Sequence, residues 1–147
     1  MDEIRAGTLH LSDVGLTAAF ESCTLPAAEF HHADHVRLAW IYVCEFGEDA
    51  AAERILAGIK RFADHNGSPG KFHVTRTLAW MALVAESRRS SPEIRSFPEF
   101  VAAHPHLFDP QRLLHFYSLS RLESEDARMG WIEPDLRTLR RCVDQSK

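Results

Sequence analysis

The sequence predicts an all-α fold, a compact single-domain bundle of about five to seven helices over residues 1–147. Apolar residues recur at intervals of three and four in several segments, as they do on the buried faces of helices. No stretch alternates apolar and polar residues for long enough to form a strand, and no Asn-Gly turn joins two such stretches. A chain of 147 residues, 45% of them hydrophobic, can bury one core without a second domain.

Helical spacing predicts four main helices, over about residues 13–23, 32–46, 49–65 and 72–88. Ser12 can cap the first helix, and Pro26 disfavours helical geometry at the residue before it. Gly47 is suited to end the second helix. These boundaries place His32 and His35 on the apolar face of the second helix, and His73 at the head of the fourth.

The last third of the chain predicts shorter helices, over about residues 97–105, 109–118 and 124–131. Pro105 ends the first of these segments. Asp109 can cap the second, where Pro110 takes the first helical position, and Ser124 can cap the third. We therefore expect a bundle of long helices followed by several short ones.

Composition and charge restrict the partners of this protein. The net charge is −4 and the pI is about 6.1, so the chain lacks the basic surface that nucleic acids or anionic membranes attract. The acidic, polar start of the sequence does not fit a secretory signal, which predicts a cytoplasmic protein. Three widely spaced cysteines fit neither a disulfide framework nor a paired zinc motif, and we expect Cys23 and Cys44 to be buried.

Nine histidines are the unusual feature of the composition. His32 and His35 are three residues apart in the first turn of one helix, close enough to share an ion. Two imidazoles rarely complete a metal site, and His73 is the natural third ligand if the helices 32–46 and 72–88 pack side by side and parallel. The predicted cofactor is therefore a divalent metal, Fe, Mn or Zn.

The other candidate residues surround this predicted metal site. Lys71 lies two residues before His73, where its ammonium could steer an anionic substrate. Lys71, His35 and His73 are the catalytic candidates. The candidates for binding the substrate, as a carboxylate clamp or as aromatic walls, are Arg37, Trp40, Trp80 and Tyr117.

Three functions fit these residues. The first is a metal-dependent enzyme, a hydrolase or oxygenase, in which His32, His35 and His73 activate water or oxygen on a small organic substrate. The second is a small-molecule binding or accessory protein in which the same histidines form hydrogen bonds inside an aromatic pocket. The third is metal-free catalysis with His35 or His73 as general base. All three take a small molecule as partner, and a homodimer is left open.

The chain also resembles a family of small bacterial proteins that have no assigned activity. The shared pattern runs F-x-H-x-x-H-[LV]-R-x-A-W, then K-[YF]-H-E-T and a tryptophan, then "YS" and "EPDL" near the C-terminus. The matching positions are Phe30, His32, His35, Arg37, Trp40, Lys71, Phe72, His73, Thr75, Trp80, Tyr117, Ser118, Glu133 and Asp135. The resemblance implies an all-helical fold and a shared histidine site. Val74 stands where the pattern has glutamate, so a carboxylate that could act as base or ligand is missing.

Overall fold

The computed structural model describes residues 11–140, which form helices and contain no strand. The three long helices are α2 (His32–Phe46), α3 (Glu48–His65) and α4 (Val74–Ser90). The shorter α-helices are α1 (Asp13–Glu21), α5 (Phe97–Ala103), α6 (Leu119–Leu122) and α7 (Glu125–Met129). Short 3-10 helices are η2 (Ala27–Glu29), η3 (Pro69–Lys71), η4 (Pro105–Phe108) and η5 (Arg112–His115). The predicted all-α fold is confirmed.

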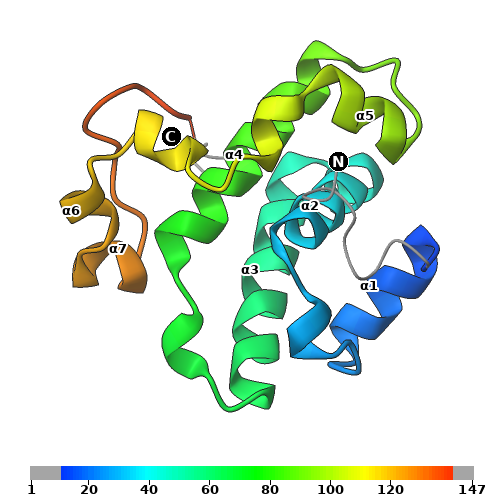
Figure 1. The fold of residues 1–147 in the computed structure, drawn as a ribbon, viewed down its shortest axis with the longest axis horizontal. Coiled ribbons are helices and arrows are strands. Elements are labelled where there is room, and N and C mark those ends of the chain that lie inside the picture. The colour runs from blue at the N-terminus through cyan, green and yellow to red at the C-terminus, as the bar shows by residue number, and fades with distance from the viewer. Residues whose placement is uncertain (1–10, 141–147) are drawn as a thin grey trace.

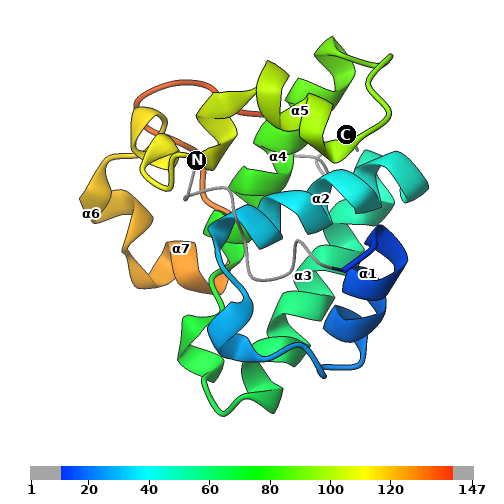
Figure 2. The same ribbon diagram turned by 45° about the vertical axis from the view of Figure 1, so that its right-hand side comes forward.

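Helices α2, α3 and α4 pack on one another and form the centre of the molecule. The chain runs along α3, turns through η3 and returns along α4, while α2 crosses α4 at a large angle (Figures 1 and 2). Helix α1 lies against α2 and α3, whereas α6 and α7 lie beside α4 on the other side of the molecule (Figure 1). None of the helices within residues 11–140 is long and apolar enough to cross a lipid bilayer.

The predicted helix boundaries are close to the observed ones for the long helices. Helix α4 begins at Val74, two residues later than expected, because His73 is the residue that caps it. The predicted α-helix over 109–118 is wrong: the segment forms the 3-10 helix η5 instead. The carboxylate of Asp109 accepts a hydrogen bond from the backbone N–H of Gln111, and this turn replaces the start of an α-helix.

Helix α2 is buried on nearly all sides because aromatic side chains cover two of its faces. One cluster joins α2 to α1 and α3 and contains Phe20, Phe30, Tyr42 and Phe62. The other joins α2 to α5 and η4 and contains Trp40, Phe97, Phe100 and Phe108. Along residues 33–43, His35 is the one exposed residue. The buried surface of this helix is therefore wider than the single apolar stripe that helical spacing predicts.

Side chains fix the irregular C-terminal segment to α4 and η5. The buried hydroxyl of Thr75 donates to the carbonyl of Gly130 at 2.6 Å and accepts from the backbone N–H of Ile132 at 3.1 Å. The phenol of Tyr117 donates to the Ile132 carbonyl at 2.8 Å. Asp135 accepts from both the backbone N–H and the hydroxyl of Ser118. These bonds replace the backbone pairing that a segment without helix or strand lacks.

The contact between α1 and α3 depends on a residue without a side chain. A Cβ placed on Gly58 would lie 2.6 Å from Cε2 and 2.7 Å from Cζ of Phe20. Phe20 is fully buried between Phe30, Phe62 and Tyr42, so its ring cannot move aside. Gly58 thus permits the close approach of the two helices.

We expect Gly58→Ala to destabilise the protein by about 1–2 kcal/mol, because the steric overlap outweighs the gain in helix propensity. Urea unfolding followed by circular dichroism measures this change. In a Phe20→Leu background the same substitution should be neutral or stabilising, because the ring edge is gone. A stabilised Gly58→Ala single variant would contradict the close-contact explanation.

Candidate functional site

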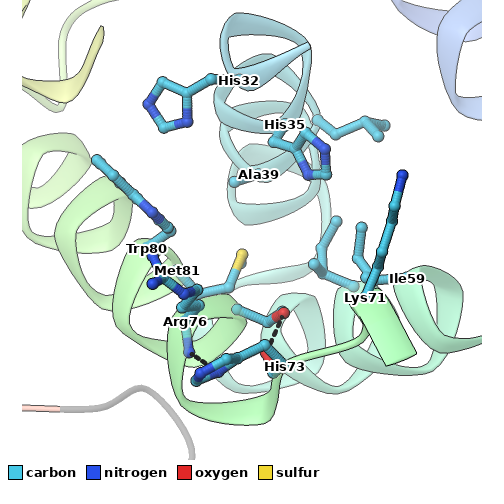
Figure 3. Close-up of a pocket in the computed structure, with 12 residues that line it drawn as sticks. His32, His35, Ala39, Ile59, Lys71, His73, Arg76, Trp80 and Met81 are labelled. Atoms are coloured by element: carbon cyan, nitrogen blue, oxygen red, sulfur yellow. Dashed lines mark hydrogen bonds between the residues drawn. The ribbon is translucent and has the colours of Figure 1, made fainter. Parts of the chain in front are cut away.

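A cavity of about 350 Å³ opens between α2, α3, α4 and η3. Its walls are mostly apolar, with a small group of nitrogen-bearing side chains. The lining residues are His32, His35, Leu38, Ala39, Ile55, Ile59, Lys71, His73, Arg76, Thr77, Trp80 and Met81. In Figure 3, His32 and His35 project from α2, His73 lies across the cavity at the start of α4, and Lys71 stands opposite Trp80.

His32, the first residue of α2, is held by two contacts. Its Nε2 lies 2.9 Å from the backbone carbonyl of Leu107. Because a carbonyl only accepts, Nε2 carries the proton and Nδ1 is left as the acceptor. The ring also meets Trp80 edge to face, with centroids 4.4 Å apart. Burial lowers the pKa of His32, so the imidazole is neutral near pH 7.

His35 lies one turn further along α2 and stacks on Phe30, with ring centroids 3.9 Å apart and planes 14° from parallel. Phe30 precedes the N-cap residue His31 and His35 is the fourth residue of α2, so the pair occupies the positions of a hydrophobic staple. The ring faces the cavity, where part of its surface is exposed, and the surrounding protein desolvates the rest. This environment lowers the pKa of His35 to about 4. The backbone N–H of His35 donates to the carbonyl of His31 at 3.1 Å, whereas its ring forms no hydrogen bond with a described residue.

His73 is the N-cap of α4 and both of its ring nitrogens are engaged. Nδ1 accepts a hydrogen bond from the backbone N–H of Arg76 at 3.0 Å. Nε2 therefore carries the proton and donates to the carbonyl of Leu122 at 2.9 Å. Burial lowers the pKa of His73 and favours this neutral form. The ring thus fixes the start of α4 to the end of α6.

The expected meeting of the two helix starts is wrong. His32 contacts Trp80, which lies seven residues beyond His73, or about 10 Å along the axis of α4. Crossed helices touch at one point, so the first turn of α2 meets the middle of α4. Within residues 11–140, no three His, Cys, Asp or Glu side chains are grouped so that they could hold a metal ion. A divalent metal at these histidines stays a prediction.

Two cations line the cavity without an acidic partner. Neither the ammonium of Lys71 nor the guanidinium of Arg76 forms an ion pair with a described residue, and Lys71 is exposed. The lining contains no aspartate or glutamate. At neutral pH the histidines are uncharged, so the charge of this site is positive and comes from Lys71 and Arg76.

Three predicted substrate-binding residues lie outside this cavity. Arg37 is buried and its guanidinium donates to the carbonyl of Leu11 and to the carboxylate of Asp13, 2.7 and 3.0 Å away. Trp40 packs against Phe97 and Phe100 in the core. Tyr117 is fully buried, and its hydroxyl donates to the Ile132 carbonyl in the C-terminal segment. Trp80 is the one predicted substrate-binding residue that lines the cavity.

Sequence reasoning missed Arg76 and gave the wrong environment for Cys44. Arg76 follows His73 by three residues, and this helical spacing was the signal that could have found it. Cys44 is exposed, near the guanidinium of Arg88 at 3.2 Å, and Cys23 is half-buried. Apolar neighbours in the sequence did not bury either thiol, because each lies at an edge of the packed core.

No family model, no curated protein and no solved structure matches this chain. The resemblance to small bacterial proteins stays a prediction. The candidate site is therefore defined by its own geometry: an apolar cavity, three neutral imidazoles on its walls, and two cations without an acidic partner within residues 11–140.

We expect His73→Ala to lower the free energy of unfolding by about 1–3 kcal/mol, since the variant loses a helix cap and a buried hydrogen bond. His73→Asn should recover about half of the loss, because asparagine caps helices well but is too short to reach Leu122. Urea unfolding measures both variants. Elemental mass spectrometry on untagged protein is the control. If the wild type contains near-stoichiometric Fe, Mn or Zn, and the His32→Ala, His35→Ala and His73→Ala variants all lose it, His73 is a metal ligand and the capping explanation is wrong.

The lowered pKa of His35 predicts that stability falls on acidification. The unfolded chain takes up a proton near the ordinary pKa of 6.5, whereas the folded protein does so only near 4. Stability is therefore complete above pH 6.5 and is lost as the pH falls toward 4. His35→Gln should reduce the proton uptake on unfolding near pH 5 by about one proton. This uptake follows from urea unfolding at a series of pH values, and the exposed His65→Gln is the matched control. Equal uptake in the His35→Gln variant and the wild type would contradict the shift.

Proposed function

We propose that this protein binds a small organic anion with an apolar body in the cavity between α2, α3 and α4. The observation that carries the proposal is the pair of cations, Lys71 and Arg76, which have no acidic partner among the described residues and line a cavity to which those residues contribute no carboxylate. Pockets for small molecules combine an apolar lining with a few polar groups that fix orientation. This cavity has that composition and a volume of about 350 Å³.

The polar groups of the cavity suit an anionic head. Lys71 is a flexible point charge, and Arg76 offers a planar fork that matches a carboxylate or a phosphate. Both lie near the start of α4, and His32 and His35 lie in the first turn of α2, where the helix dipoles add positive potential. Leu38, Ile55 and Met81 supply apolar surface for the body of the ligand.

The protonation of the histidines favours binding over base catalysis. A general base works best with a pKa near the working pH, and His35 with a pKa of about 4 is a weak proton acceptor at pH 7. His73 has no lone pair to spare, because its Nδ1 already accepts from Arg76. His32 instead offers Nδ1 as an acceptor, and the neutral ring of His35 can donate a hydrogen bond to a bound molecule or accept one from it.

The metal-dependent enzyme is less well supported by the same residues. A divalent cation beside His32 and His35 would lie in a cavity that already contains two positive charges and no carboxylate to offset them. His73 would have to give up its bonds to Arg76 and Leu122 to become a ligand. An anion meets neither obstacle.

Binding is tested with hexanoate, hexyl phosphate and hexylamine, which share an alkyl chain and differ in the charge of the head. Backbone and indole N–H shifts in NMR spectra report the site through Trp80 and Thr77. We expect hexanoate or hexyl phosphate to shift these signals, and hexylamine to leave them unchanged. Lys71→Gln should weaken binding of the anion about tenfold, since a charge-assisted hydrogen bond is lost.

Lys60→Gln is the matched control, because Lys60 is exposed on α3 and pairs with Asp64 at 3.2 Å. This variant should bind the anion as the wild type does. Equal binding of hexylamine and the anions, or an equal effect of the two lysine substitutions, would overturn the proposal.

A further inference from the structure

A second cavity of about 250 Å³ adjoins the first beneath η2 and the end of α3. His35, Ile59 and Lys71 line both cavities and therefore mark the junction between them. The residues that line the second cavity alone are Ala27, Phe30, Phe62, Ala63, Asn66 and Ser68. The two cavities are therefore neighbours, with His35 and Ile59 between them.

The lining of the second cavity combines apolar walls with two uncharged polar residues. Phe30, Phe62 and Ala63 make its walls apolar. Asn66 and Ser68 are its uncharged polar residues. The amide nitrogen of Asn66 donates to the carbonyl of Phe62 at 2.8 Å, which leaves the amide oxygen as an acceptor. The polar end of this cavity thus suits a group that donates a hydrogen bond and carries no charge.

The charges fix the direction in which a ligand lies. Arg76 lines the first cavity alone, Lys71 lies at the junction, and the second cavity has no other charged residue in its lining. An anionic head is therefore held in the first cavity, between Lys71 and Arg76. The uncharged end of the same molecule reaches toward Asn66 and Ser68.

From this arrangement we infer that the ligand is an elongated acid that fills both cavities, with its anionic head between Lys71 and Arg76 and a hydroxyl or amide at its far end. The inference rests on the proposed function and adds the length and the two ends of the ligand. His35 stacks on Phe30 at the junction. In the inferred complex, its ring contacts the middle of the ligand.

The test compares pentanoate, decanoate and a decanoate with a terminal hydroxyl on the full-length protein by NMR titration. Pentanoate is short enough for the first cavity, and the longer acids need both. We expect the hydroxyl-bearing acid to bind most tightly, decanoate next and pentanoate least. Ala63→Leu should weaken the two long acids about tenfold by filling the second cavity, and should leave pentanoate unchanged. Ala39→Leu is the matched control, because it fills the first cavity and should weaken all three.

Asn66→Leu keeps the test decisive if the buried Ala63 position does not tolerate leucine, because Asn66 is exposed. This variant should remove the preference for the terminal hydroxyl and keep the affinity for decanoate. If pentanoate and decanoate bind equally, and neither Ala63→Leu nor Asn66→Leu changes binding, the elongated ligand is excluded while the proposed anion site stands. If none of the three acids binds, the proposed function itself fails.

Discussion

Two hydrogen bonds from neutral histidines connect the two halves of this protein. His32 and His73 stand at the starts of α2 and α4, and their Nε2–H groups donate to the carbonyls of Leu107 and Leu122, which lie 75 and 49 residues further along the chain. Both bonds need a proton on Nε2, and the bond that His73 Nδ1 accepts from the backbone N–H of Arg76 also needs that nitrogen to be unprotonated. Burial favours the neutral rings by lowering both pKa values. The walls of the cavity therefore depend on the same bonds that join α2 to η4 and α4 to α6.

One set of residues shapes the cavity, and a different set gives it charge. His32 and His73 are fixed by backbone partners, and His35 is stacked on Phe30. Lys71 and Arg76 have no acidic partner among the described residues. Under the proposed function, this neutral frame and the two cations select the charge of the ligand without the cost of rearranging the frame.

Several residues of the sequence pattern stabilise the fold. Thr75, Tyr117 and Asp135 hold the irregular C-terminal segment, whose backbone would otherwise be left without partners. Arg37 connects α2 to Asp13 at the start of α1, and Trp40 fills the core beside α5. Only part of the pattern lies at the cavity: His32, His35, Lys71, His73 and Trp80. The spacing of these residues in the sequence does not show which of them stabilise the fold and which line the cavity.

Local sequence was sufficient for the all-α fold, for the long helices and for the serine caps of two short ones, because helical periodicity and capping act over a few residues. Ser12 and Ser124 cap α1 and α7 as expected, and His32, His35 and His73 do line one cavity. Only the tertiary structure decided how α2 crosses α4, and hence that His32 meets Trp80 instead of His73. It also decided that His73 donates to the carbonyl of Leu122, and that Arg37, Trp40 and Tyr117 lie away from the cavity. The reason is physical: crossing angles and carbonyl partners depend on how distant side chains fit together, and no local pattern encodes that fit.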